Sequence, residues 1–320
     1  LLDGSGVQGQ WENVMVIPAC NESPGFLRPS PSCGGRSLMI LVINEPVSAS
    51  REVSDNNQSL ARTVLERFQL RRQSDRKFAG FSLGLLSDAN SPRDVLLVDR
   101  YNDTRQLPDK GGVGQARKIG VDLAASLVHR GRIRSPWIHC TDADVRLPEN
   151  YFHCCHRWQD TGEDVAALVY PFQHCDASGS GGEVFLATRL YERSLHYYVA
   201  GLKFAGSPYA FHTIGSTMAV SAVHYARVRG FPKRAAGEDF YLLNKLAKVG
   251  SVIEISEDMG CEPIEIESRF SDRVPFGTGA AVGKISEMAD PVKDFRFYNP
   301  RVFELLRLWL HSWPEIWRSR

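Results

Sequence analysis

Short apolar runs alternate with segments of helical spacing along the first half of the chain. Each run has the length of a buried strand and ends at a proline or a polar residue. Strands joined by helices predict an α/β fold with a doubly wound, mostly parallel sheet flanked by helices. The predicted strands cover residues 14–17, 38–43, 95–98 and 137–140, and predicted helices begin near residues 55 and 114.

Residue chemistry sets several expected boundaries. Pro18 should end the first strand, because proline lacks the N–H group that a sheet uses. Asp55 or Asn56 should cap the helix after the second strand. The segment 71–93 is basic and then rich in Gly and Ser, which predicts an irregular insertion, whereas the aromatic segment 183–204 predicts a long helix.

Composition places the chain among soluble globular proteins. Its 320 residues are 43% hydrophobic and 23% charged, enough to bury one large core or two smaller ones. The 38 basic and 37 acidic residues leave a net charge of +1, so no global field attracts a polynucleotide. We therefore expect no nucleic-acid partner, and any anionic ligand must be held by local geometry.

The seven cysteines are irregularly spaced and contain no CxxC pair, which favours free thiols in a reducing, cytoplasmic compartment. His153, Cys154, Cys155 and His156 are soft metal ligands in a row. Neighbouring residues of a helix point in different directions, however, so we expect no zinc site there. No apolar run approaches the length of a membrane span, and a segment before Leu1 is left open.

Two carboxylates follow the apolar run that begins at Trp137. Asp142 and Asp144 would lie at the carboxyl end of a buried strand, where open α/β sheets bind ligands. Two neighbouring carboxylates repel each other, and their oxygen atoms suit Mg²⁺ or Mn²⁺. The alternative is that one of them caps the helix expected near Pro148.

Other strand ends carry candidate ligand-binding residues. A glycine-rich loop at 109–114 opens a helix and brings Arg117 toward the same edge of the sheet, although such a loop is also a common plain connector. Small residues begin a strand expected at 212–220, where they leave room for a ligand or for close backbone packing. The strand-end candidates are Asn21, Glu22, Asn44, Asp99, Gly215 and Ser216.

A third acidic site lies near the start of a helix expected between Gly237 and Gly250. Asp239 shares a helical face with Leu242 and two further leucines, so it should point inward and could act as a general base. Glu238 is better explained as a favourable charge at the helix N-terminus or as a support for its neighbour.

Four of these motifs together resemble family 2 glycosyltransferases of the GT-A fold. The motifs are Pro18-Ala19-Cys20-Asn21-Glu22, Gly114-Gln115-Ala116-Arg117, Thr141-Asp142-Ala143-Asp144 and Gly237-Glu238-Asp239-Phe240, and the resemblance spans residues 11–257. It implies a GT-A-like catalytic domain. It further implies that Pro18, Asn21 and Glu22 line the nucleotide site, Arg117 lies near the base, Asp142 faces the ribose or metal, Asp144 binds the metal and Asp239 is the base.

The chain also departs from the family pattern. Asn44 and Glu45 stand where the family usually has aspartate, which bears on base recognition: a UDP-sugar is the favoured donor and a GDP-sugar the alternative. Lys118-Ile119-Gly120 replaces the usual Asn-x-Gly, and the Gln-x-x-Arg-Trp motif of processive enzymes is missing. We therefore expect a single transfer rather than chain elongation.

The resulting hypothesis is a metal-assisted hexosyltransferase that moves a sugar from a nucleoside diphosphate to an acceptor hydroxyl with inversion, with Asp239 as base. One alternative is a retaining transferase or a sugar-1-phosphate nucleotidyltransferase; the latter is disfavoured because the first strand leads to Pro18 rather than to a glycine-rich arginine loop. A further alternative is a non-catalytic binding module. It is disfavoured because Asp142, Asp144 and Asp239 are all present.

We expect residues 1–260 to form the catalytic domain, with a nucleotide-binding half at 11–147 and an acceptor half at 148–260. Residues 261–320 should form a lid-like loop and a helical extension. Arg269 and Arg273 would close on the diphosphate, unless this is a passive surface loop.

The C-terminal segment has apolar residues at helical spacing beside arginines. It could lie on a membrane surface, and packing onto the catalytic domain or a second subunit is the favoured alternative. The residues are Val302, Leu305, Leu306, Trp309 and Trp313, beside Arg301, Arg307, Arg318 and Arg320.

Overall fold

The computed structural model divides the chain into two compact units. Unit 1 comprises residues 1–172 and 214–265, and unit 2 comprises residues 173–213 and 266–320. The expected nucleotide and acceptor halves, and the boundary near residue 260, concern function and stay predictions. The description leaves out residues 1–10, 28–34, 74–81, 89–90, 103, 160–161, 177–181, 233–236, 271–277 and 319–320, and the side chains of 314–318.

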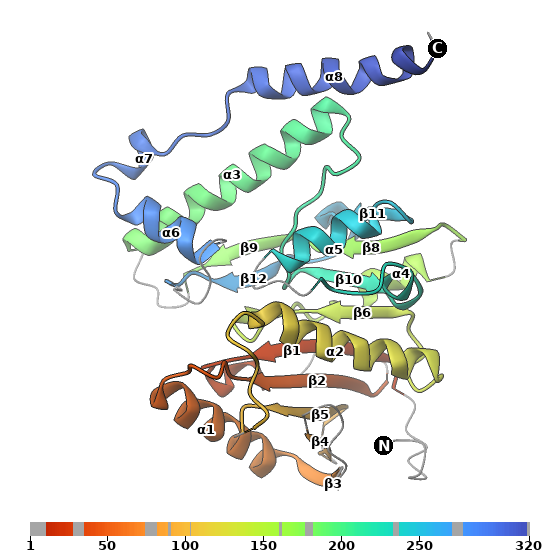
Figure 1. Ribbon diagram of the computed structural model, residues 1–320, viewed down its shortest axis with the longest axis vertical. Helices are drawn as coiled ribbons and strands as arrows, with labels where there is room; N and C mark the ends of the chain where they lie inside the picture. The colour runs from red at the N-terminus through yellow and green to blue at the C-terminus, as the bar shows by residue number, and fades with distance from the viewer. Residues whose placement is uncertain are drawn as a thin grey trace. The chain divides into compact units, whose positions relative to one another are not determined.

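The core of unit 1 is a large mixed sheet, and the predicted α/β class is confirmed (Figure 1). Within the described residues its nine strands have the order β11-β8-β10-β6-β1-β2-β5-β4-β3. The central strands β6, β1, β2 and β5 run parallel, as do β8 and β11, while β10 and β4 run antiparallel to their neighbours. The strands are β1 Asn13–Ala19, β2 Ser37–Asn44, β3 Gln69–Gln73, β4 Ser82–Ser87, β5 Arg93–Arg100, β6 Trp137–Cys140, β8 Val165–Val169, β10 Met218–Ser221 and β11 Ser251–Glu254.

Helix α2 packs closely on the centre of this sheet. Every residue of β1, β2 and β5 is buried, as expected for parallel strands covered on both faces. Gly120 of α2 faces Val16 and Val42, and a Cβ atom there would lie 3.2 Å from Cγ2 of Val42 and nearer still to Val16. A glycine is therefore needed at this crossing. The helices of unit 1 are α1 Arg51–Arg67, α2 Gly112–His129, α4 Ala222–Arg227 and α5 Glu238–Leu246.

Unit 2 is mostly helical, and its long helix α3 matches the predicted segment closely. Ala187 of α3 forms a small apolar core with Val282 and Ile285 of α6. Among the described residues, each helix is too short or too polar to cross a membrane. The helices of unit 2 are α3 Glu183–Ala205, α6 Thr278–Ser286, α7 Pro291–Asp294 and α8 Pro300–Arg318.

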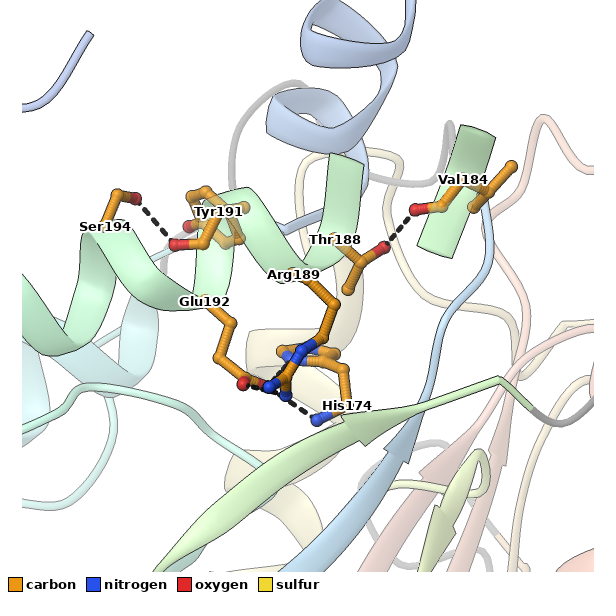
Figure 2. Close-up of polar contacts among 7 residues, drawn as sticks. All are labelled: His174, Val184, Thr188, Arg189, Tyr191, Glu192 and Ser194. Carbon is orange, nitrogen blue, oxygen red and sulfur yellow. Dashed lines mark hydrogen bonds and ion pairs between the residues drawn. The ribbon is translucent and has the colours of Figure 1, made fainter. Parts of the chain in front are cut away.

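A buried polar cluster ties the start of unit 2 to α3, as Figure 2 shows. The Glu192 carboxylate accepts hydrogen bonds from the backbone N–H of His174 (2.6 Å) and from Nη1 of Arg189 (2.5 Å), and its Oε2 lies 2.8 Å from His174 Nδ1. Burial alone would raise the pKa of Glu192, but these hydrogen bonds and the Arg189 charge hold it below its ordinary value. The carboxylate therefore stays ionised and paired at neutral pH.

Shorter elements complete the described chain. A second sheet of three strands has the order β7-β12-β9. Its strands are β7 Val145–Arg146, β9 Phe172–Cys175 and β12 Ile264–Glu267, and the 3₁₀ helices are η1 Pro24–Leu27, η2 His153–Trp158 and η3 Glu257–Met259.

Three expected boundaries were wrong. Pro18 lies inside β1. The Val16 carbonyl accepts a hydrogen bond from the Thr141 N–H, so the backbone of Val16, and that of Pro18 two residues later, faces the β6 side of the strand. The pairing of β1 with β6 ends at Val16, so the N–H group that proline lacks is not needed there. Helix α1 begins earlier than expected because Ser50, not Asp55 or Asn56, caps it. The segment 71–93 contains the end of β3 and all of β4, which pair antiparallel, and in β4 Leu83 and Leu85 flank Gly84.

Two cysteines form a disulfide, so the expectation of free thiols is wrong for them. Cys154 and Cys261 are 107 residues apart in sequence with Cα atoms 5.6 Å apart. Nearby, Nδ2 of Asn150 donates to the Gly260 carbonyl (2.7 Å), which joins the same two segments. Such spacing carries no local signal, and the argument for a reducing compartment loses its basis.

Two cysteines in the run of four soft ligands contact different partners. Cys154 points to Cys261, whereas the Cys155 thiol lies 2.8 Å from the Tyr170 hydroxyl. Within the described part of the chain, no group of three or more His, Cys, Asp or Glu side chains could hold a metal.

The disulfide should contribute measurably to stability. Cys154→Ser and Cys261→Ser should each lower the free energy of unfolding by about 2–5 kcal/mol, since either change reopens a long loop in the unfolded chain. Urea unfolding of each variant, with and without dithiothreitol, measures this.

The double variant serves as the control. It should be no less stable than either single variant, and reductant should lower the midpoint of the parent alone. If the double variant lost the sum of the two single-variant losses in free energy of unfolding, the cross-link would be contradicted. The same holds if the urea midpoint of the parent does not change in reductant although thiol titration shows free thiols.

Candidate active site

A buried arginine joins three elements at the carboxyl edge of the sheet. Arg117 lies in α2, Asp142 follows β6, and Glu238 is the first residue of α5. The Arg117 side chain is 3% exposed, and its Nη2 donates to Oδ1 of Asp142 (2.5 Å) while Nη1 donates to Oε1 of Glu238. One guanidinium thus holds two carboxylates from distant parts of the sequence.

The charges of this cluster reinforce one another. Burial lowers the pKa of Arg117, but the negative charges of Asp142 and Glu238 outweigh it and raise that pKa above its ordinary value. The arginine is therefore charged at every relevant pH. A charged, buried guanidinium needs both partners, because a buried charge without one is costly.

Gly215 packs directly against the arginine. A Cβ atom at this position would lie 2.8 Å from Cζ of Arg117 and closer still to Nη1. The small residues before β10 therefore make room for the guanidinium, which is the close-packing explanation for them. Ser216 beside it is 4% exposed. A role for Gly215 and Ser216 in ligand binding stays a prediction.

Asp239 stands next to this cluster. The residue is partly exposed, and its Oδ1 accepts from the backbone N–H of Phe240 (2.7 Å). Burial of its carboxyl and the neighbouring charge of Glu238 raise the pKa of Asp239 from 3.8 to about 6, against the opposing charge of Arg117. Asp239 is thus ionised at pH 7 but holds its proton far more readily than an ordinary aspartate.

The inward face of α5 differs from the expected one. Glu238, rather than Asp239, is the more buried acid, at 3% exposed, and it stands four and eight residues before the fully buried Leu242 and Leu246. That i, i+4, i+8 spacing puts all three on one face. Glu238 does more than complement the helix dipole, because it is an ion-pair partner of Arg117.

A divalent ion at this edge stays a prediction, with Asp142 and Asp144 as its candidate ligands. Asp142 is engaged by Arg117, and Asp144 is partly exposed just before β7. Since the described residues hold no cluster of three ligands, the protein alone does not form a closed metal cage here. Mg²⁺ and Mn²⁺ often bind one or two carboxylates and take their other ligands from water and substrate phosphates.

A polar network fixes the ends of β1 and β2. Oδ1 of Asn57 accepts from the backbone N–H of Asn21 (2.9 Å), and its Nδ2 donates to the Asn44 carbonyl (3.3 Å) and to Glu45 (3.2 Å). Asn21 has φ 56°, the left-handed region that asparagine tolerates. Asn56 donates to the Asn21 side chain (2.7 Å).

Asn57 was missed by sequence reasoning, yet a signal was present. It is fully buried, and it stands three, four and seven residues before Leu60, Ala61 and Val64 on the inward face of α1. A polar residue on the apolar stripe of a helix needs partners. Here those partners are the two strand ends.

Other predicted residues belong to the framework of the edge. Asn44 donates to the Ala19 carbonyl (3.0 Å), and Pro18 is buried within β1. Asp99 accepts from the backbone N–H groups of Tyr101 (3.2 Å) and Asn102 (3.1 Å), which shapes the turn after β5. In the predicted glycine-rich loop, Asp109 accepts from the backbone of Ser48 (2.9 Å).

The remaining predicted residues are placed less closely. Glu22 is partly exposed in the loop after β1. Arg269 is partly exposed in unit 2, and Arg273 lies outside the described residues. The structure thus brings together Arg117, Asp142, Gly215, Glu238 and Asp239, and separately Asn21 and Asn44.

Comparison with protein-family models and with curated proteins finds no match. Among solved structures, the chain is similar to a mannosyltransferase from Pyrobaculum calidifontis in complex with GDP-mannose and Mn²⁺, at 13% identity and a TM-score of 0.46, over 95% of this chain and 71% of that one. It is also similar to a mycobacterial protein, at 12% identity and a TM-score of 0.39, over 85% of this chain and 71% of that one.

Proposed function

We propose that the chain is a metal-assisted glycosyltransferase that moves a sugar from a nucleoside diphosphate to an acceptor hydroxyl with inversion. The observation that carries this proposal is the Arg117 cluster, which holds the Asp142 segment and the Glu238-Asp239 helix start side by side at the carboxyl edge of the sheet. Arg117 fixes Asp142 and Glu238, and we assign metal binding and proton transfer to residues close to them in sequence, Asp144 and Asp239. The four family 2 motifs support the same assignment.

Asp144 would bind Mn²⁺ or Mg²⁺, with Asp142 beside it. Loss of a nucleoside diphosphate leaves negative charge on two phosphates, and a divalent ion supplies Lewis-acid stabilisation of that charge when bound. Because Asp142 is already paired with Arg117, we assign the direct metal contact to Asp144 and a positioning role to Asp142.

Asp239 would act as the general base. An acceptor hydroxyl is a poor nucleophile, and a carboxylate within reach takes its proton as the new bond forms. A pKa of about 6 leaves the carboxylate mostly ionised at neutral pH and a stronger base than an ordinary aspartate. Glu238 would help to position Asp239 through its ion pair with Arg117. A retaining transferase on the same fold would not need this base.

The donor assignments complete the proposal. We assign the nucleotide to the edge near Pro18, Asn21, Glu22, Asn44 and Asp99, with Gly215 and Ser216 toward the sugar. A UDP-hexose is the favoured donor and a GDP-sugar the alternative. A contact of Arg269 and Arg273 with the diphosphate stays a prediction, and the Cys154–Cys261 disulfide leaves no basis for assigning the protein to the cytoplasm.

The first test separates chemistry from binding. Asp239→Asn keeps the size of the side chain but removes the proton acceptor, so sugar transfer should fall on the order of 10²–10⁴-fold while donor affinity survives. Turnover at saturating donor, a binding constant for the nucleotide sugar and NMR of the product's anomeric configuration measure this.

A matched control is Asp258→Asn, which changes an exposed aspartate of η3 and should leave transfer unchanged. Near-normal turnover in Asp239→Asn, or a product that retains the donor's configuration, would show that the proposed mechanism is wrong.

The second test uses pH. Activity should fall as the pH drops through about 6, because Asp239 must be ionised to accept a proton. Glu238→Gln should move this inflection to lower pH, since the charge of Glu238 raises the pKa of Asp239. The pH dependence of kcat/KM measures both.

The raised pKa of Asp239 also predicts how the stability of the protein depends on pH. The folded state raises the pKa of Asp239 from 3.8 to about 6, so its contribution to stability is present below pH 4 and is lost as the pH rises through about 6. Asp239→Asn should remove that loss. An unchanged stability profile in this variant would mean that Asp239 titrates normally.

The third test concerns the metal. Asp144→Asn should abolish the Mn²⁺-dependent rise in melting temperature that UDP or GDP produces, while the melting temperature without ligand stays unchanged. Asp239→Asn is the control and should keep the metal-dependent rise. An equal metal-dependent rise in melting temperature in the parent and in Asp144→Asn would show that Asp144 does not bind the metal.

A further inference from the structure

Helix α8 carries a row of large apolar side chains on its surface. Val302, Leu305, Leu308, Trp309 and Trp313 are each between 43% and 68% exposed. Val302, Leu305, Trp309 and Trp313 are spaced i, i+3, i+7 and i+11, so they lie along one side of the helix. The rings of Trp309 and Trp313 are 5.5 Å apart. A contiguous exposed patch of this kind marks an interaction surface.

The opposite side of α8 is already used within unit 2, where α3 and α8 lie side by side (Figure 1). Phe303 is 4% exposed, and its ring leaves no space for a Cβ atom at Gly201 of α3. Arg307 lies over the ring of Phe204 at 4.9 Å. The contact with α3 therefore does not cover the row that contains Leu305 and Trp309.

Positive charge is concentrated in the same segment. Residues 295–320 contain five arginines (296, 301, 307, 318 and 320) and two glutamates (304 and 315), which gives a net charge of +3. The whole chain has 38 basic and 37 acidic residues, so the rest has 33 and 35, a net charge of −2. The apolar row thus belongs to a segment whose charge favours a negative partner.

We propose that the exposed face of α8 docks onto an anionic lipid surface, with the helix lying in the plane of the membrane. Tryptophan favours the boundary between headgroups and acyl chains, and arginine reaches phosphate groups from the same depth. A second copy of the chain suits this face less well, because it would bring a segment of charge +3 against another of charge +3. An anionic bilayer complements both the charge and the apolar row.

Vesicle flotation tests the proposal with the full chain. Binding to vesicles of about equal parts phosphatidylcholine and phosphatidylglycerol should exceed binding to phosphatidylcholine alone, and about 1 M salt should weaken it because screening shortens the reach of the charges. Leu305→Glu and Trp309→Glu should each weaken binding on the order of tenfold. The matched control is Leu65→Glu, which changes an exposed apolar residue of α1 in the same way and should bind as the parent does.

Two outcomes would overturn the proposal. One is equal flotation of the parent and both α8 variants. The other is a parent that fails to float but sediments as a dimer which Trp309→Glu dissociates, since that result assigns the face to a second copy. Circular dichroism of each variant confirms that it is folded. The test does not depend on catalysis, so its result is independent of the proposed transferase activity.

Discussion

The ion pairs of one buried guanidinium organise the candidate active site. Arg117 arises from the helix between β5 and β6, yet its partners Asp142 and Glu238 belong to segments 25 and 121 residues away in sequence. Removing one partner of a buried pair typically costs about 3–5 kcal/mol, because the other charge is left uncompensated. The positions of the strand end and of the α5 start therefore depend on each other through this side chain.

Two glycines decide whether the arginine can occupy its place. Gly120 lets α2 approach β1 and β2, which sets the height of the helix above the sheet. Gly215 leaves the space that the guanidinium fills. Neither residue contributes a functional group, but a methyl group at either position would collide with what the site requires. Charge and available volume thus act together at this edge.

Local patterns predicted the parts of the fold that local chemistry determines. The apolar runs gave the parallel strands, and the aromatic segment gave α3, because burial on both faces and helical spacing are visible in the residues themselves. Strands β3 and β4 were missed because Gly84 and the surrounding polar residues obscure a short alternation. In the site, the sequence identified Arg117, Asp142, Glu238 and Asp239 but not that one of them holds two others, since that depends on where α5 returns to the sheet.

The Cys154–Cys261 cross-link has a mechanical consequence. It closes a covalent ring that contains α3, β10 and α5, whereas Arg117 and Asp142 lie on the chain before the ring. A force applied to the two ends of the oxidised chain would pass through the disulfide and bypass the ring. The strand end that carries Asp142 would bear the force, whereas the segment that carries Glu238 and Asp239 would not be extended.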